Sequence, residues 1–374
     1  MGPPRHVAII QPAVPLYRVP FFTRLIAAGE EEGINIDVFG GEMPTEIRAR
    51  GDSSDAAFVR ALTTRELKFR GRALFYKSTA PVRRGGYDLV ILEHAVRNIE
   101  TYELLVRLRG RRVAFWGHGR THTKNVSPQQ ESFKYWLARR ATWFFGYTAG
   151  GVEAVIEHGF PEDRTTVLNN TIDTAALRAD LSMISASEVL EFSRHHDLRG
   201  STALYLGGID TDKRIPFLLD SAVIAHERCS DFRLLIAGNG SDRSIVEGFV
   251  ARNSWASYLG AVHGRDKARA LAAAQALCIP GRIGLIAVDS MVAGTPIVTT
   301  NFPHHAPEFE YLADGVTSVV TKFNVDSYAA GLVAFLNDRP RQKEMGDRCR
   351  IEADFYTLDR MVSSFLSGIN SALG

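Results

Sequence analysis

Short apolar runs alternate with helical stretches over almost the whole chain. In the first half these runs lie at 6–11, 34–40, 87–93, 112–117, 143–148 and 165–170. In the second half they lie at 202–207, 232–238, 257–262, 276–280, 296–300 and 317–321. Several runs are continuously apolar, which is typical of strands whose sheet is covered on both faces. The alternation therefore predicts an α/β fold built on parallel, doubly wound sheets.

The alternation occurs twice, with a helix-prone, charged interruption at 174–200. A chain of 374 residues also suits two domains better than one. We predict two Rossmann-like domains over 1–180 and 181–345, followed by a C-terminal helix over 346–374. By analogy with other two-domain chains, we expect that helix to pack back toward the first domain. A cleft between the carboxyl ends of the two sheets is expected to hold the ligands.

Composition narrows the class of protein without naming a function. Hydrophobic residues make up 45% and charged residues 23%, as in a globular protein. Three widely spaced cysteines form neither a disulfide framework nor a paired metal site. The N-terminus does not resemble a signal peptide, and the most apolar stretch, 271–288, is interrupted by Arg282. We expect a cytoplasmic protein.

Basic residues gather in the first half, which has 25 Lys and Arg against 20 Asp and Glu over 1–180. One interpretation is a solvated surface. The other is a domain that meets an anionic acceptor or the inner face of a membrane. We do not expect nucleic acid, because no stacking aromatics are interleaved with the basic residues. The densest segment is 60–84, with Arg60, Arg65, Lys68, Arg70, Arg72, Lys77, Arg83 and Arg84.

Ligands of doubly wound sheets bind where strands end, so the residues after each strand are the candidates for a site. Gly207 and Gly208 follow 202–206 and allow a close backbone approach. Lys213 and Arg214 then begin a helix, where two cations could neutralise a diphosphate. The alternative is that both cations belong to the surface.

The loop after the next strand contains Gly238, Asn239 and Gly240. It lies between a strand and a helix, as in dinucleotide-binding loops. The third glycine of that motif is replaced by Arg243, so the signal is weak. A tight turn explains these glycines equally well.

The most informative segment runs from Pro280 to Pro296. Gly281 and the residues Ile283, Gly284 and Leu285 lead into a short apolar helix, whose N-terminal N–H groups form an anion site. Asp289 is the only carboxylate within that helix. A buried carboxylate needs partners. A ribose diol would supply them, and so would a backbone cap or a nearby base.

The first half offers candidates at its own strand ends. His118 stands between two glycines after 112–116, where it would project toward a ligand. Tyr17 and Arg18 lie in the first loop, from Gln11 to Phe22, and are candidates for the acceptor wall. His94 and Asn170 also follow strands, and we expect both to face the ligand. A structural role is the alternative for each histidine.

Together these motifs resemble the family 4 glycosyltransferases, which have the two-domain GT-B fold. The resemblance covers nearly the full length and includes a bacterial subgroup with a Pro-Gly-x-x-Gly-Leu loop. The matching residues are Gly207, Gly208, Ile209 and Lys213; Gly238, Asn239 and Gly240; Pro280, Gly284, Leu285, Asp289, Met291, Gly294 and Pro296; and Asn170, Thr171, Ile172 and Asp173.

Three family positions differ in this chain. The first glutamate of the family's paired-glutamate motif is Gly281, and the second is shortened to Asp289. The arginine of the Gly-Arg-Leu turn is Gly208. A sugar-facing carboxylate and a phosphate-binding cation are therefore missing from their usual places.

The resemblance implies transfer of a hexose from a UDP- or GDP-sugar, with retention of configuration and no required metal or other cofactor. The implied acceptor is a saccharide, a lipid-linked compound or a small molecule, as in bacterial polysaccharide biosynthesis. His118, Lys213 and Arg214 would act in catalysis. The alternatives are a sugar-nucleotide epimerase or hydrolase and a non-catalytic binding protein of the same fold. A dehydrogenase is disfavoured, because no complete dinucleotide-binding motif is present.

Overall fold

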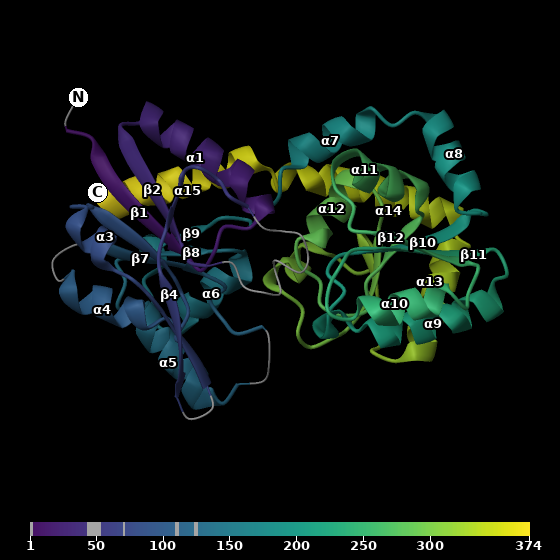
Figure 1. The fold of residues 1–374 in the computed structure, drawn as a ribbon, viewed down its shortest axis with the longest axis horizontal. Helices are drawn as coiled ribbons and strands as arrows, with labels where there is room; N and C mark the ends of the chain where they lie inside the picture. Colours follow the sequence, from purple (N-terminus) through teal and green to yellow (C-terminus); the bar gives the residue numbers. More distant parts are fainter. Residues whose placement is uncertain (1–2, 43–53, 70–71, 109–111, 123–125) are drawn as a thin grey trace. The chain divides into compact units, whose positions relative to one another are not determined.

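The computed structural model describes residues 3–42, 54–69, 72–108, 112–122 and 126–374 (Figure 1). The chain forms two compact units. The N-terminal unit contains the described residues up to Asn170 together with Leu358–Gly374, and the C-terminal unit contains Thr171–Thr357. The units thus divide at Asn170, ten residues before the domain boundary expected from the sequence.

Parallel strands form the core of the N-terminal unit, in the order β3-β2-β1-β6-β7-β8-β9 among the described residues. Chain order runs outward from the β1/β6 boundary in both directions, which is the doubly wound arrangement with its switch point at that boundary. The predicted α/β class is confirmed. The strands are β1 (Arg5–Gln11), β2 (Ile34–Gly40), β3 (Val59–Ala61), β6 (Leu89–Glu93), β7 (Arg112–Gly117), β8 (Trp143–Gly146) and β9 (Thr165–Val167).

Helices cover both faces of this sheet (Figure 1). One face packs against α1 (Val19–Glu31) and α15 (Leu358–Leu373), around Phe21, Trp116 and Phe365. Apolar residues spaced along α15 form one buried stripe, which explains why the end of the chain belongs to this unit. The other face packs against α3 (Ala80–Arg84), α4 (Ile99–Arg107), α5 (Pro128–Ala138) and α6 (Ala149–Glu157).

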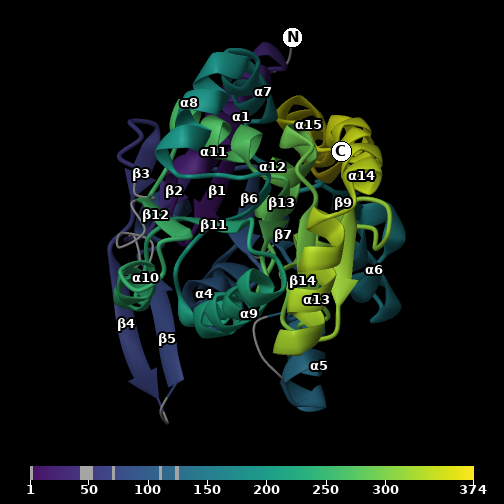
Figure 2. The ribbon, with the colours of Figure 1, turned by 90° about the vertical axis from the view of Figure 1, so that its right-hand side faces the viewer.

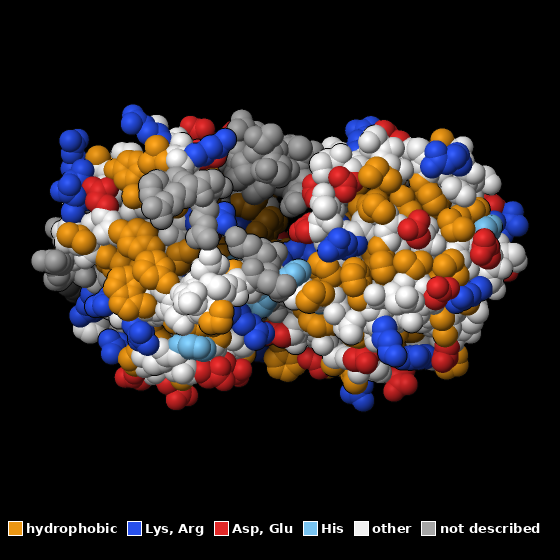
Figure 3. Space-filling view, turned by 90° about the horizontal axis from the view of Figure 1, so that it is seen from below, with side chains coloured by type: hydrophobic (Ala, Val, Ile, Leu, Met, Phe, Trp, Pro, Cys, Tyr) orange, Lys and Arg blue, Asp and Glu red, His pale blue; other side chains and the backbone are white. Residues whose placement is uncertain are grey.

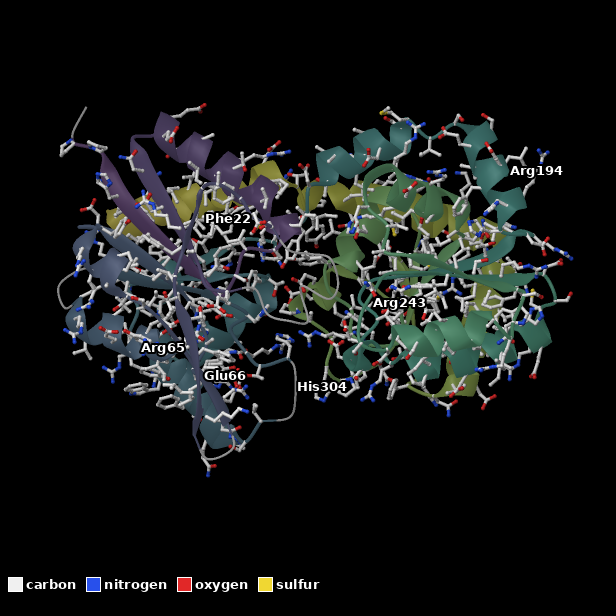
Figure 4. The ribbon with its side chains drawn as sticks, in the orientation of Figure 1. Phe22, Arg65, Glu66, Arg194, Arg243 and His304 are labelled. Atoms are coloured by element: carbon white, nitrogen blue, oxygen red, sulfur yellow. The ribbon has the colours of Figure 1, made fainter. Side chains whose placement is uncertain are left out.

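An antiparallel hairpin, β4 (Thr64–Phe69) and β5 (Arg72–Lys77), lies outside the main sheet (Figure 2). The sequence predicts only a basic surface in this segment, and the hairpin corrects that prediction. Arg65, Glu66 and Lys68 are exposed on β4, and the first two are labelled in Figure 4. Charged residues on an edge strand hide the period-2 signal. Arg70 and the side chain of Arg72 lie outside the described residues.

The C-terminal unit repeats the doubly wound plan. Its described strands are parallel and follow the order β12-β11-β10-β13-β14-β15, with the switch point between β10 and β13. Two Rossmann-like units were predicted, and the strand order confirms them. The strands are β10 (Ser201–Leu206), β11 (Phe232–Ala237), β12 (Ala256–Gly260), β13 (Ala276–Cys278), β14 (Ile297–Thr300) and β15 (Ser318–Thr321).

Two sets of helices enclose the second sheet, and both views show them on opposite faces (Figures 1 and 2). The first set is α9 (Ile215–Arg228), α10 (Arg243–Val250) and α13 (Val325–Leu336). The second is α7 (Thr174–Ser182), α8 (Ala186–His195), α11 (Gly264–Ala273), α12 (Ile286–Ala293) and α14 (Arg339–Glu352).

The sequence predicts a single helix over 346–374, whereas the structure has two helices in the tail, α14 and α15. A short 3-10 turn at Ala353–Phe355 follows α14, and Tyr356 then leaves the helical region with φ −113° and ψ 57°. The next helix, α15, belongs to the other unit. Among the described helices, none combines the length and apolar character needed to cross a bilayer.

Candidate functional site

The first two strand ends of the C-terminal unit are joined through glycine turns. Gly207 and Gly238 have φ of 151° and 146°, values that favour glycine. A Cβ on Gly238 would lie 1.8 Å from the carbonyl oxygen of Gly207, and one on Gly240 would lie 2.4 Å from that of Ile209. Glycine at 238 and 240 is therefore required by the contact between the two turns, whatever ligand they hold.

Backbone hydrogen bonds hold these turns in register. The N–H of Ile209 donates to the carbonyl of Asn239 at 2.9 Å, and Asn239 Oδ1 accepts from the N–H of Gly240 at 3.0 Å. The helix after the second turn begins at Arg243, labelled in Figure 4. The two turns therefore form a rigid floor, with few side chains, at the carboxyl ends of β10 and β11.

A cationic cluster stands at the switch point, where the loops after β10 and β13 meet. Lys213 ends a 3-10 turn at Thr211–Lys213, and its Nζ donates to the carbonyl of Arg282 at 2.7 Å. The N–H of Arg282 donates to the carbonyl of Asp212 at 3.1 Å. Lys213 and Arg282 are therefore neighbours, although 69 residues separate them.

Arg282 is the functional candidate that the sequence analysis missed. Its Nη1 donates to the carbonyl of His304 at 2.9 Å, and its Nε lies 3.8 Å from Asp212 Oδ2; His304 is labelled in Figure 4. The side chain is 16% exposed. Burial lowers the pKa of Arg282, whereas Asp212 and Glu308 raise it. A second basic side chain thus belongs to the loop that Lys213 contacts.

Gly281 has a steric reason to be glycine. A Cβ there would lie 2.6 Å from the carbonyl carbon and oxygen of Lys213 and 2.8 Å from the carbonyl oxygen of Asp212. Any side chain would push the loops after β10 and β13 apart. The missing glutamate is thus a consequence of the close approach that places Lys213 against Arg282.

Behind this loop, His305 fixes the start of α12. Its Nδ1 accepts from the N–H of Ile283 at 3.0 Å, and its Nε2 lies 2.9 Å from the carbonyl of Thr300, to which it donates in the neutral form. Burial lowers the pKa of His305 to about 4, with the nearby Lys213 and Arg282 adding to the effect. The neutral ring thereby anchors Ile283, and Gly284 and Leu285 lead into the helix.

The N-terminus of α12 carries no side-chain cap at Leu285. Ala287 and Val288 donate to the carbonyls of Gly284 and Leu285 at 3.0 and 2.9 Å, so it is the helix dipole at this end that favours an anion at the same strand edge. Among the candidate donor residues, Gly284 leaves room, since a Cβ there would meet only Ala306 Cβ, at 3.8 Å.

Asp289 pairs with a basic residue, which is one of the alternatives that the sequence leaves open. Its Oδ1 lies 2.5 Å from Lys267 Nζ on α11, and the residue is 8% exposed. Arg214 adopts φ 57° and ψ 45°, and its guanidinium lies over Phe302 and Phe323, 5.2 and 5.8 Å from the ring centroids. Lys213 and Arg214 therefore have different surroundings, although they are adjacent.

The strand-end candidates of the N-terminal unit form a second, aromatic cluster. His118 is exposed and its ring lies 4.5 Å from that of Tyr147. Arg18 is 5% exposed, with its guanidinium carbon 5.0 Å from the Trp116 ring centroid and 5.2 Å from that of Tyr147. Tyr17 is 41% exposed beside it. Tyr147 was missed, since an aromatic residue after a strand resembles any core residue.

The turn that carries His118 is pressed against α6. Gly119 has φ 70°, and a Cβ on it would lie 1.9 Å from the carbonyl oxygen of Gly151. Both glycines are needed for this contact, which fixes the backbone on either side of the exposed histidine.

His94 and Asn170 are both buried. His94 is 4% exposed, its Nε2 lies 3.0 Å from the carbonyl of Lys134, and its ring contacts Phe115 and Phe144. Burial lowers its pKa to about 3. In this structure its surroundings are those of a core residue. Asn170 is 3% exposed, and its N–H donates to the carbonyl of Tyr147 at 2.8 Å.

No group of three or more His, Cys, Asp or Glu side chains within the described ranges is placed to hold a metal ion. The candidate residues of the C-terminal unit offer cations and backbone amides, which suit an anion. The chemistry in the N-terminal unit is aromatic and imidazole-based, suited to a polar organic ligand.

The fold, with its two Rossmann-like units, is that of GT-B proteins. Residues 200–338 match the family model for Glycosyl transferases group 1. A phosphatidyl-myo-inositol mannosyltransferase of Mycobacterium leprae is 31% identical over 172 residues. That match spans 43% of this chain and 43% of the relative, so under half of the relative's length is covered.

Solved structures extend the likeness to nearly the whole chain, at the level of fold. Anabaena HepE in complex with UDP and glucose superposes with a TM-score of 0.68 at 14% identity, covering 98% of this chain and 100% of that one. A glycosyltransferase from Rickettsia africae gives a TM-score of 0.70 at 11% identity, covering 99% of each chain.

Proposed function

We propose that this protein is a glycosyltransferase that moves a sugar from a nucleotide diphosphate to an acceptor. The observation that carries the proposal is the contact of Lys213 with Arg282 beside the start of α12. It lies at the switch point of a unit whose residues 200–338 match a glycosyl transferase family. Two cations and a helix N-terminus suit a diphosphate.

The reaction follows from how this cluster handles charge. When the bond between the anomeric carbon and the phosphate oxygen breaks, its electron pair stays on the leaving diphosphate. Lys213, Arg282 and the helix dipole at the start of α12 stabilise that charge as it develops. The acceptor hydroxyl forms the new bond to the anomeric carbon, and its proton passes to an oxygen of the leaving diphosphate. We propose retention of configuration and no required metal, on the basis of the family 4 resemblance.

The remaining candidates receive roles by position. Asp289 would hold the ribose, with the ion pair to Lys267 orienting its carboxylate. Gly207, Gly208, Gly238, Asn239 and Gly240 would supply a close-fitting backbone floor for the donor. Arg214 would tune the electrostatics of the diphosphate from outside the contact between Lys213 and Arg282.

We assign the acceptor to the N-terminal unit, at the cluster of Tyr17, Arg18 and His118. The mycobacterial relative is named for transfer of mannose to phosphatidyl-myo-inositol, so a lipid-borne or saccharide acceptor is the first class to test. UDP- and GDP-hexoses are the donors to test, and the inner face of the membrane is the proposed place of reaction.

The first test is binding, followed by transfer. Thermal shift with UDP, GDP and their sugars identifies the donor, because a ligand that binds only the folded state raises the melting temperature. Lys213→Ala should then reduce turnover by two or more orders of magnitude, since one lost charge contact in a transition state costs about 3 kcal/mol.

Lys213→Arg serves as the matched control, because it keeps the charge and should keep part of the turnover. A normal rate in Lys213→Ala would exclude this cluster from the chemistry. Release of free sugar in every acceptor mixture would indicate a hydrolase, and no nucleotide stabilisation at all would contradict the donor site itself.

A further inference from the structure

A ladder of aromatic rings, half-buried at Tyr102 and exposed at Phe133 and Trp136, runs across α4 and α5 of the N-terminal unit. Tyr102 on α4 stacks on Phe133 of α5 with 6.4 Å between centroids, and Phe133 stacks on Trp136 at 5.3 Å. Phe133 and Trp136 are 44% and 39% exposed, and Val106, one helical turn after Tyr102, is 59% exposed. We call these four residues the α4–α5 aromatic face.

This face is unusual because its apolar residues lie next to one another. Single exposed apolar residues are common on any protein, whereas a contiguous group marks an interaction site. Neither ring of α5 is used by the core, which the same helix fills with Tyr135, Leu137 and Ala138. Figure 3 views the side on which α5 lies, and hydrophobic side chains gather there among Lys and Arg.

The charges at this face are positive. The guanidinium carbon of Arg140 lies 4.6 Å from the ring centroid of Trp136. Of the carboxylates on α3, α4 and α5, Glu100 is buried against Lys77, Glu103 lies 2.9 Å from Arg107, and Glu131 accepts from the N–H of Thr121 at 2.8 Å. The basic residues on these helices and directly after α5 are Arg83, Arg84, Arg107, Lys134, Arg139 and Arg140.

We propose that the α4–α5 aromatic face rests on an anionic phospholipid surface. Trp and Tyr favour the interface between lipid headgroups and acyl chains, and Arg can keep its charge among the headgroups while its stem stays apolar. A negative leaflet also attracts exposed Lys and Arg. The aromatic rings supply the buried area, and the arginines supply the preference for negative lipids.

A second copy of the chain fits this face less well. In a symmetric contact each copy presents the same patch, so the arginines around one ladder would meet those around the other. Like charges brought together in this way oppose association. An anionic bilayer has the complementary charge over the whole area of the face.

The segment 60–84, where the sequence analysis located a basic surface, is less suited to this role. Arg60 pairs with Asp37 at 2.8 Å, and Lys77 is buried with Glu100 at 2.6 Å. Two of its charges are thus neutralised within the unit. Arg140, directly after α5, is instead an exposed arginine that lies over an exposed ring, that of Trp136.

The proposed contact lies in the same unit as the candidate acceptor cluster, which α5 (Pro128–Ala138) follows in the chain. Lipid binding itself requires no sugar transfer, so it can be tested without the proposed reaction.

The decisive experiment is sedimentation of the full chain with vesicles, without nucleotide. One set contains phosphatidylcholine alone, and the other contains phosphatidylcholine with about one third phosphatidylglycerol. We expect binding to the second set, weakened at high salt. Phe133→Ser with Trp136→Ser should lower the partition coefficient about tenfold or more, because two large apolar contacts are lost.

The matched control changes two apolar residues of the C-terminal unit that are each 50% exposed, Leu190→Ser with Phe355→Ser. It should bind vesicles like the parent protein. Equal binding by the aromatic double variant, or no binding by the parent protein, would overturn the proposal. A parent protein that dimerises in sedimentation velocity, with loss of the dimer in the variant and no vesicle binding, would assign the face to a second copy.

A fluorescence readout covers the case in which the double variant does not fold. The protein has four tryptophans, and Trp116 and Trp143 are buried. Insertion of Trp136 should shift the emission to shorter wavelength on anionic vesicles and allow quenching by brominated lipid. Both changes should disappear in Trp136→Phe, and their persistence there would rule out contact through this ring.

Discussion

At Gly281 the absence of a side chain allows two loops of the C-terminal unit to touch. The atoms that a Cβ would meet are backbone atoms of Asp212 and Lys213, which cannot rotate away. Restoring the family's acid as Gly281→Glu should therefore lower the free energy of unfolding by about 1–3 kcal/mol. It should also weaken nucleotide binding, because Lys213 would be displaced. Urea unfolding and calorimetry measure the two effects.

Gly284→Ala is the control for that substitution, since its nearest neighbour would be Ala306 Cβ at 3.8 Å. It should leave stability within about 0.5 kcal/mol of the parent value. If Gly281→Glu were as stable as Gly284→Ala, the steric explanation for the missing glutamate would be wrong.

His305 makes the stability of the C-terminal unit dependent on pH. Its pKa is about 4 in the folded protein, against about 6.5 in an unfolded chain. Between these values the unfolded state binds the extra proton, so stability is complete above pH 6.5 and falls as the pH drops toward 4. Lowering the pH from 7 to 5 should cost up to about 2 kcal/mol through this ring.

The measurement compares the unfolding free energies at pH 7 and pH 5 for the parent protein and His305→Asn. The asparagine can still accept from Ile283 but does not titrate, so its pH-dependent loss should be smaller. An unchanged loss would show that other groups cause the dependence. His94 in the N-terminal unit, with a pKa of about 3, contributes in the same direction and is common to both proteins.

The sequence identified most strand-end positions but not which side chains meet there. Lys213 and Gly281 were found because glycine loops after strands have a recognisable pattern. Arg282 was not found, because its role depends on His304 and Asp212, which approach it only in the folded unit. The partner of Asp289 was equally inaccessible, since Lys267 lies on a different helix.

At the scale of elements, a buried ion pair fastens the hairpin to α4. Lys77 Nζ lies 2.6 Å from Glu100 Oε1, and the two side chains are 4% and 3% exposed. Removing one charge leaves the other buried without its partner, so Glu100→Gln should destabilise the N-terminal unit by about 3 kcal/mol. Replacing both, as Lys77→Met with Glu100→Leu, should cost much less, which a double-mutant cycle in urea would detect. Additive losses would contradict a coupled pair.

The main sheet strands were predictable because both of their faces are buried, so each is a continuous apolar run. The hairpin β4–β5 was not, because Arg65, Glu66, Leu67 and Lys68 of β4 are all exposed, so no alternation of buried and exposed residues marks the strand. The break between α14 and α15 also escaped prediction. It depends on the backbone at Tyr356, and both flanking sequences favour helix.

At the scale of the whole molecule, the described residues of the C-terminal unit form one continuous segment, whereas those of the N-terminal unit do not. Residues 171–357 contain one sheet with helices on both faces and their own core. Expressed alone, this segment should fold and bind the same nucleotide as the full chain. Circular dichroism and calorimetry provide the measurement. An unfolded 171–357 would mean that the first unit is needed for its stability.

The return of α15 to the first unit has a consequence for how the protein is made. Met361, Phe365 and Ile369 are fully buried among residues from the beginning of the chain. During synthesis the first unit must therefore wait, with one face of its sheet only partly covered, until α15 leaves the ribosome. The second unit can complete its fold earlier. A premature stop before α15 would thus damage the part of the protein that was made first.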